Sequence, residues 1–377
     1  MKHRIVKSVS MLCLLGLGVT AAASAQEQIG PPSSTWTLPA CSRIVGSSAL
    51  TFTADDGATL TPGTRPLQGT TYAKGLVALD TPNVLLGAVQ SVLYRSTDAG
   101  CSWRVLADLS SQASGELLTL TKAGGERAYA WSDNRGILFR VDGKTVTTLR
   151  SPVTSIVGLG TDPRNLDHAR LGDSTGQVWE SYDAGATWSP LGSPALAGAF
   201  AYRVAFNPAS PDHIVVGTMV NGAFVTTDGA RSWTQATGLS KGNANVFNLV
   251  VSPADPQVVW AMGIDLAIAD TDPGNGRFIY RSVDGGYTYA PVVHQDPAAG
   301  INMQNGPTLA AHPADANLLY WDFGVSFGNY GTDLYKVDAA TGQVTWTHNP
   351  YHGIGAIEFS PASSSLLYLG LELVQIQ

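Results

Sequence analysis

The residues best suited to chemistry or ligand binding lie in four segments between positions 265 and 353. These segments, residues 265–276, 294–307, 323–331 and 347–353, combine carboxylates, imidazoles and aromatic rings. Carboxylates and imidazoles transfer protons and bind cations, whereas aromatic faces offer broad contact to a sugar or a peptide. The alternative is that the segments only pack on one another. The candidate binding residues are Asp265, Asp270, Asp272, His294, Asp296, Phe327, Tyr330, Tyr351 and His352.

Metal binding is one chemistry that these segments allow. The three aspartates of residues 265–276, together with Asn275, are oxygen ligands of the kind that calcium takes. The terminal glutamate of a calcium loop is missing, so a solvated polar turn explains the segment as well. His294, His348 and His352 could meet as metal ligands, but isolated histidines are more often simple hydrogen-bonding groups at the surface. We expect no metal and no cofactor, with calcium as the alternative.

Hydrolysis is the second possible chemistry, because a glycosidase needs two carboxylates a few ångströms apart. Asp296 and Asp322 are the candidate catalytic acids, although nothing in the sequence selects a pair. The chain contains no nucleophile elbow, zinc signature or phosphate loop. We therefore expect a binding module, and a carbohydrate-active hydrolase or lyase is the alternative.

A repeated turn motif indicates the strands that hold these segments in place. The pattern is Ser/Thr-x-Asp-x-Gly-x-Thr-Trp, as in Ser181–Trp188, and it recurs at intervals of roughly 40–50 residues. Asp suits a tight turn because its carboxylate accepts hydrogen bonds from nearby backbone N–H groups, and Gly tolerates positive φ. Carboxylates spaced one per repeat cannot converge on one site. We therefore expect structural roles for Asp55, Asp98, Asp142, Asp183, Asp228, Asp284 and Asp338.

This pattern resembles the Asp-box, or BNR repeat, of sialidases, sortilin-type receptors, xyloglucanases and the photosystem II assembly factor. The resemblance covers about residues 49–370 and implies a β-propeller, but it does not specify an activity. Sialidases of this type have six blades and an Arg-Ile-Pro segment, whereas this chain has seven repeats and Arg43-Ile44-Val45. Xyloglucanases pair two propellers around a cleft, and one is present here.

The repeats predict an all-β, seven-bladed propeller of four-stranded antiparallel blades. After the sixth full repeat, residues 354–359 and 366–371 supply only a first and a second strand. Residues 49–53 and 58–61 supply the missing third and fourth strands. We expect these terminal segments to share one blade, which closes the ring and removes open sheet edges.

The faces of the ring follow from strand order. Turns containing proline, such as Asn207-Pro208-Ala209, follow the first strands, and the Asp turns follow the third strands. We expect these two kinds of turn at different ends of the blades. The loops after second and fourth strands should share the face opposite the Asp turns. Because long loops on a rigid scaffold carry function, we expect the interaction site in the sector from Asp265 to His352.

The amino-terminal segment has the features of an export signal. A basic start, an apolar stretch and a small-residue cleavage site predict a signal peptide at residues 1–25 and a mature start at Gln26. Residues 26–47 would form an arm, and residues 48–377 the propeller. We expect a secreted or periplasmic protein without a membrane span.

Two cysteines remain after removal of the signal peptide. Cys41 and Cys101 should form a disulfide in an oxidising compartment. The net charge of −7 gives no attraction to phosphate backbones, so nucleic acid is excluded as an expected partner. We expect a monomer that recognises a protein or a carbohydrate through its loop-rich face.

Overall fold

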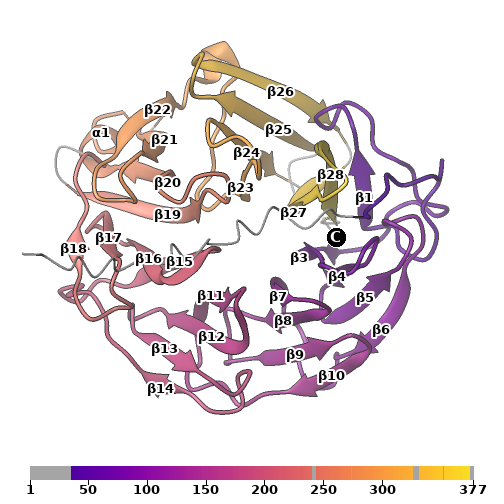
Figure 1. Cartoon of the computed structure of the whole chain (residues 1–377). Coiled ribbons are helices and arrows are strands. Elements are labelled where there is room, and N and C mark those ends of the chain that lie inside the picture. The colour runs from indigo at the N-terminus through magenta and orange to yellow at the C-terminus, as the bar shows by residue number, and fades with distance from the viewer. Residues whose placement is uncertain (1–34, 240–242, 273, 326–330, 351, 374–377) are drawn as a thin grey trace, which may run out of the picture. The chain divides into compact units, whose positions relative to one another are not determined.

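Seven four-stranded antiparallel sheets are arranged around a central axis, as Figure 1 shows. This is the predicted all-β, seven-bladed propeller. The computed structural model describes residues 35–239, 243–272, 274–325, 331–350 and 352–373. The expected signal peptide and the start at Gln26 therefore lie outside the described residues.

In six of the blades the strands run outward from the axis in chain order. The inner strands are β3 (Gly75–Ala78), β7 (Thr119–Gly124), β11 (Ile156–Asp162), β15 (Ala201–Asn207), β19 (Ala244–Val251), β23 (Leu309–Ala311) and β27 (Gly353–Ser360). The second strands are β4 (Leu85–Val89), β8 (Arg127–Trp131), β12 (Asn165–Asp173), β16 (Ser210–Thr218), β20 (Val259–Asp265), β24 (Leu318–Val325) and β28 (Ser363–Leu373).

The outer strands complete the blades. The third strands are β5 (Val92–Ser96), β9 (Leu138–Asp142), β13 (Val178–Ser181), β17 (Ala223–Thr226), β21 (Arg277–Ser282) and β25 (Gly331–Asp338). The fourth strands are β6 (Arg104–Asp108), β10 (Thr145–Thr148), β14 (Ser189–Pro190), β18 (Thr234–Gln235), β22 (Ala290–His294) and β26 (Gln343–Asn349). We number the blades 1 to 6 from β3–β6 to β23–β26, and the seventh is the closing blade.

The closing blade combines strands from both ends of the chain. β28 pairs with β27 on one edge, and on its other edge with β1 (Leu50–Thr53) and then β2 (Thr71–Tyr72). The shared blade is as predicted, but residues 58–61 form no strand. Pro62, Gly63 and Pro66 follow at once, and proline cannot donate to a ladder. The chain therefore loops away and returns as β2.

Apolar side chains fill the spaces between adjacent blades. Trp260, Trp321 and Tyr335 are fully buried between blades 5 and 6, and the Trp321 and Tyr335 rings stack at 4.9 Å. Inner and second strands are apolar on both faces because each face packs on a neighbouring blade. This packing makes the ring a rigid support for its loops.

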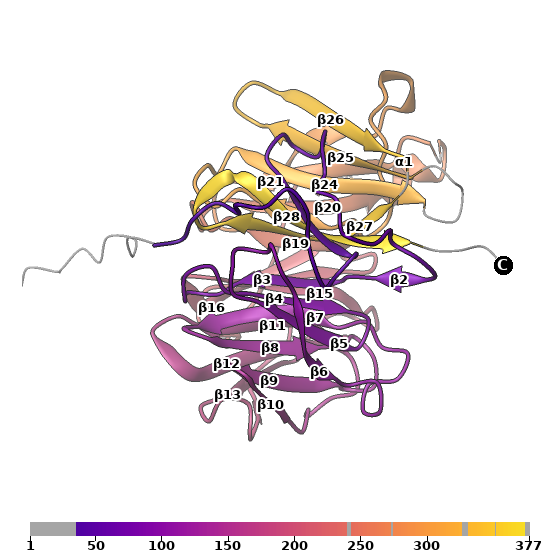
Figure 2. The same ribbon diagram turned by 90° about the vertical axis from the view of Figure 1, so that its right-hand side faces the viewer.

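The proline turns and the Asp turns lie at the same end of the blades, contrary to our expectation. In blade 4 the backbone N–H of Gly229 donates to the carbonyl of Asp212, and in blade 3 that of Ala184 donates to Asp167. First and third strands of an antiparallel blade run in the same direction, so their following turns must meet. We call this end the turn face. The opposite loop face carries the short helix α1 (Leu266–Ala269), at the right in Figure 2.

The Asp turns are held by a recurring set of hydrogen bonds. Asp183 accepts from the backbone N–H and hydroxyl of Thr187, at 2.8 and 2.6 Å, and from the hydroxyl of Ser181 at 2.8 Å. The turns at Asp55, Asp98, Asp228 and Asp284 repeat this arrangement. The two divergent copies differ, since Asp142 instead accepts from Arg127 and Arg140, and Asp338 from Ala340 and Thr341.

The Cys41–Cys101 disulfide is present and joins residues 60 positions apart. It fastens the segment before β1 to the Asp98 turn of blade 1. Val45 forms a parallel bridge with Ser102, and Ile44 is fully buried beside this blade. Along the described stretches, no helix is long and apolar enough to cross a membrane.

Candidate functional site

A channel of about 770 Å³ runs along the axis of the ring, toward the turn face. All seven inner strands contribute to its wall, and the volume lies in the range of small-ligand sites. Most of the lining is aliphatic. Each blade contributes at least one aliphatic side chain, with one representative per blade in Val77, Leu120, Leu159, Ala205, Leu249, Leu309 and Ile357.

Three of the four charged side chains of the channel have partners. Lys122 and Asp80 form an ion pair of 2.6 Å near the turn face. Glu358 accepts a hydrogen bond of 2.9 Å from the backbone N–H of Ala78, on the exposed edge of β3. Burial raises the pKa of Glu358 to about 7, so this carboxyl is partly protonated near neutral pH.

Arg203 is the fourth charged side chain, and the described structure gives its guanidinium no hydrogen-bond acceptor. Its Nε atom is buried and unpaired, and the guanidinium lies 5.9 Å from the centre of the Trp131 ring. Burial lowers the pKa of Arg203. Blade 4 approaches blade 3 closely here, since a Cβ at Gly158 would fall 1.9 Å from the carbonyl oxygen of Val204.

An aromatic ladder follows the loop-face ends of two inner strands. The Phe200 and Tyr202 rings lie 4.7 Å apart, and the Tyr202 and Phe247 rings 4.9 Å apart. Phe200 is 41% exposed, so the ladder begins at the surface, and Tyr202 directly precedes Arg203 in β15. The ladder was not predicted from the sequence, although two aromatic residues alternate at the start of this inner strand.

The carboxylates of residues 265–276 mainly organise their own loop. Asp265 is buried and caps α1 by accepting from the N–H of Ala267 at 3.0 Å. Asp272 accepts from the side chain of Asn275 at 2.6 Å, and Asp270 is exposed. No group of three metal-binding side chains occurs among the residues that the structure describes.

The remaining predicted binding residues are spread over the loop face. Asp296 accepts from the N–H groups of Ala298 and Ala299 at 3.1 Å and so caps the 3-10 turn Pro297–Ala299. His294 is exposed at the end of β22. His352 lines a cavity of about 720 Å³ beside the closing blade, and burial lowers its pKa. Outside the described residues lie Phe327, Tyr330 and Tyr351.

Asp322 is a buried carboxyl of this sector, with 4% of its surface exposed. It accepts from the N–H of Thr308 at 2.6 Å and from the side chain of Gln304 at 3.0 Å. Burial raises its pKa to about 6. On the next strand, buried Asp333 pairs with His348 at 2.7 Å. Both oxygens of Asp322 hold the segment before β23, which is a structural task.

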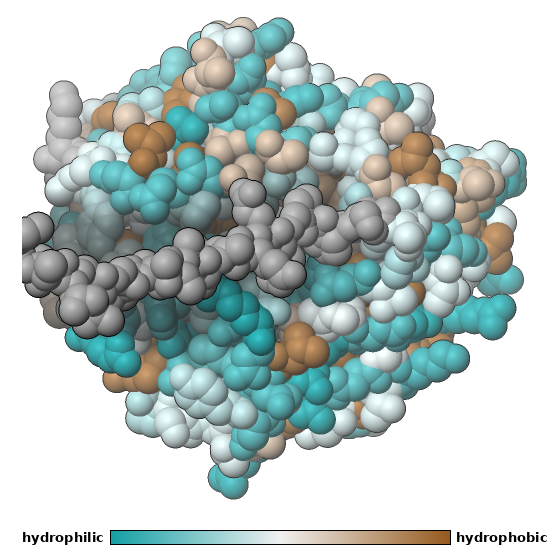
Figure 3. Space-filling view, viewed as in Figure 1, coloured by the Kyte–Doolittle hydropathy of each residue, from teal (hydrophilic) through white to brown (hydrophobic). Residues whose placement is uncertain are grey.

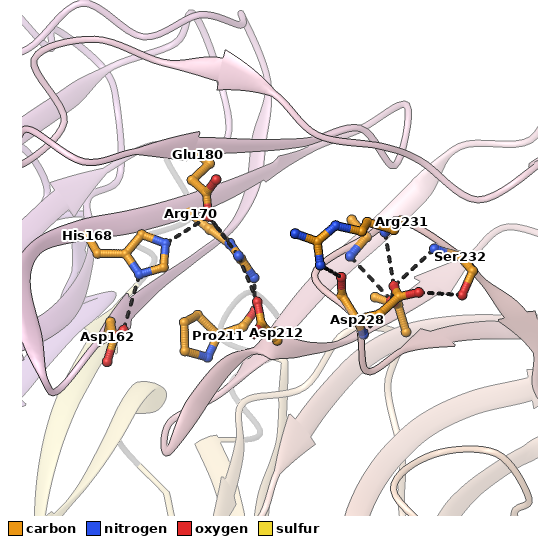
Figure 4. Close-up of polar contacts among 11 residues, drawn as sticks. Asp162, His168, Arg170, Glu180, Pro211, Asp212, Asp228, Arg231 and Ser232 are labelled. Atoms are coloured by element: carbon orange, nitrogen blue, oxygen red, sulfur yellow. Dashed lines mark hydrogen bonds and ion pairs between the residues drawn. The ribbon is translucent and has the colours of Figure 1, made fainter.

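A polar clasp on the turn face joins blades 3 and 4, as Figure 4 shows. His168 contacts Glu180 at 2.9 Å and Asp162 at 3.2 Å. Arg170 bonds Glu180 and reaches Asp212 of blade 4 at 2.7 and 2.8 Å. Because these side chains are largely satisfied by one another, they fix the two blades together.

The clasp was also not predicted from the sequence. Its members are spread over about fifty positions, and only the alternation of His168 and Arg170 along β12 places them on one face. Tyr182 covers His168, with ring centres 4.5 Å apart, and is itself 65% exposed. In Figure 3, which views the turn face, hydrophobic residues appear as separate spots on a mainly hydrophilic surface.

Comparisons with known proteins place the fold and the chain. No protein-family model matches the sequence. The chain is 51% identical over 363 residues to the dispase autolysis-inducing protein of Streptomyces mobaraensis. The aligned region covers 95% of this chain and 96% of that protein.

Two solved structures share the propeller fold. A GH74 enzyme of Niastella koreensis aligns with a TM-score of 0.59 and 17% identity, over 81% of this chain and 52% of the enzyme. YCF48 bound to D1 peptide aligns with a TM-score of 0.56 and 13% identity, over 90% of this chain and all of YCF48.

Proposed function

The chain belongs to the family of the dispase autolysis-inducing protein, and on that premise we propose that it is an exported propeller that binds a partner protease and promotes the self-cleavage of that protease. The name of the relative says that it induces the autolysis of dispase. Autolysis is performed by the protease itself, so the propeller needs to supply binding and not hydrolysis. This agrees with Asp296, whose carboxylate accepts hydrogen bonds from its own turn, and with Asp322, whose oxygens hold the segment before β23.

The observation that carries this proposal in the structure is the aromatic ladder of Phe200, Tyr202 and Phe247. Aromatic side chains that are partly exposed on a rigid support are the anchors that dominate protein interfaces. The sector from Asp265 to His352 would form the second part of the same contact face, with Ile268 of α1 exposed on it. The fold-level likeness to YCF48, a propeller solved with a peptide, is compatible with this arrangement.

A binding protein can promote autolysis only by differential affinity. If the propeller binds a locally opened form of the protease better than the closed form, it raises the population of the opened form. The opened segment is then cleaved by a second copy of the protease, because proteolysis needs an extended, accessible chain.

Export is supported by the amino-terminal segment, whose basic and apolar pattern predicts a signal peptide. The disulfide fits an oxidising compartment.

The proposal is tested by following dispase activity and fragments with and without the mature chain. We expect the chain to accelerate both the loss of activity and the appearance of fragments. Replacing Phe200 and Tyr202 together with alanine should slow the effect by at least tenfold, since aromatic anchors carry a large share of binding energy. The control is Tyr182→Ala, which removes an exposed aromatic ring from the turn face.

Two results would contradict the proposal. One is an unchanged time course of dispase fragmentation when the chain is added. The other is release of reducing ends from xyloglucan oligosaccharides by the chain, with loss of this activity in Asp322→Asn, which would favour the carbohydrate-active alternative.

A further inference from the structure

The feature that the proposed function leaves unexplained is the unpaired cation inside the channel. Arg203 is a member of β15, and its guanidinium reaches across blade 3 to the Trp131 ring of blade 2. The described residues offer it neither a carboxylate nor a carbonyl oxygen, and its Nε is shielded from solvent. Five donors are therefore directed at the ring and the channel.

Such an arrangement is unfavourable in the empty protein. The Arg203 side chain is partly exposed to the channel, but its Nε atom has lost hydration, and without an acceptor this loss is not offset. Structural arginines of this chain show the usual solution, since Arg170 bonds a carboxylate and a carbonyl, and Arg127 bonds two carboxylates. Arg203 differs from them in facing a cavity, which indicates a ligand with an anionic group.

The other channel groups limit what that ligand is. Lys122 is already paired with Asp80, and Glu358 at the far end presents a second carboxyl that disfavours another anion there. Between them the wall is aliphatic. The ligand should carry one anionic end and apolar groups behind it.

We propose that the loop-face end of the channel binds the C-terminal carboxylate of an apolar peptide, with Arg203 as its anion-binding residue. Guanidinium and carboxylate match in a planar, two-bond geometry, and the aliphatic wall of the channel accommodates the last side chains. This inference rests on the proposed function, because every autolytic cut creates a new C-terminal carboxylate. The site would hold the cut segment of the protease away from the enzyme.

The test uses the mature chain and two peptides, acetyl-Leu-Phe-Leu as the free acid and as the C-terminal amide, in isothermal titration calorimetry. We expect the acid to bind about tenfold to a hundredfold more tightly than the amide, as charge-assisted hydrogen bonds require. Arg203→Met should remove this preference, and Arg203→Lys should retain a part of it. The control is Arg104→Met, at an exposed arginine on the outer strand of blade 1.

The position of the bound carboxylate is checked by tryptophan fluorescence, because Trp131 contacts the guanidinium. The acid should change the emission of the wild-type chain and leave that of Trp131→Phe unchanged. Equal binding of acid and amide, no binding of the acid at 10 mM, or unchanged binding by Arg203→Met would overturn the inference. So would equally strong displacement by inorganic phosphate, which would show a general anion site. Because no protease is present, failure here leaves the autolysis experiment to be judged separately.

Discussion

At the scale of single residues, side-chain carboxyl groups occur in three different settings in this chain. The Asp-turn carboxylates accept backbone N–H groups at the surface, whereas Asp265 and Asp296 cap short helical turns on the loop face. Asp322 and Glu358 are buried and have raised pKa values. A sequence pattern separates the first group, because it repeats. It does not separate the other two, because burial depends on which strands meet.

Asp183→Ala tests the role of the Asp turns. The variant loses the acceptor for Thr187 and Ser181, and we expect a loss of about 1 kcal/mol in the free energy of unfolding, measured by urea denaturation. Binding to dispase should be unchanged. The control is Asp133→Ala, which removes an exposed aspartate. Unchanged stability together with lost binding would assign Asp183 to the interface.

Glu358→Gln tests the buried carboxyl of the channel. Its folded pKa of about 7 lies above the ordinary value of 4.5. Between these values the folded chain holds a proton that the unfolded chain has released, so stability falls as pH rises through this window. The glutamine retains an acceptor for Ala78 and does not titrate. The wild type should lose up to about 3 kcal/mol relative to the variant between pH 5 and 8. Parallel pH profiles of the two proteins would contradict this.

At the scale of elements, register and turns were predictable where local chemistry decides them. The repeated Asp turn, the proline turns and the shared closing blade follow from short motifs. The prediction of a fourth strand at residues 58–61 was wrong because Pro62 and Pro66 prevent a continuous ladder. We expected the proline turns and the Asp turns at opposite ends of the blades, whereas the antiparallel order of the strands requires them at the same end. The ladder at Phe200 and the clasp at Arg170 depend on contacts between blades, which no single repeat encodes.

Removal of the disulfide tests how the segment before β1 is held. Replacing Cys41 and Cys101 with serine should lower the free energy of unfolding by about 2–4 kcal/mol, because the crosslink restricts the unfolded chain. Thermal unfolding with and without reductant measures the effect. Thiol counting of the denatured, unreduced protein should find none. Two free thiols, or a melting temperature insensitive to reductant, would contradict the assignment.

At the scale of the whole molecule, the ring is a rigid support with two different faces. The turn face is polar and crosslinked within and between blades, as at the clasp of His168 and Arg170. The loop face carries the long segments and the exposed end of the aromatic ladder. The fold was predictable from the repeat alone. The partner was not, because propellers with the same blades serve unrelated functions.

We propose that the propeller acts on the protease copy that is cleaved. The most direct measurement mixes catalytically inactivated dispase, as substrate, with a trace of active dispase and follows fragments by mass spectrometry. We predict that the mature chain accelerates cleavage of the inactivated copy at least tenfold and that no fragments form without active dispase. Fragments formed by the chain alone, or an unchanged rate in its presence, would contradict the account.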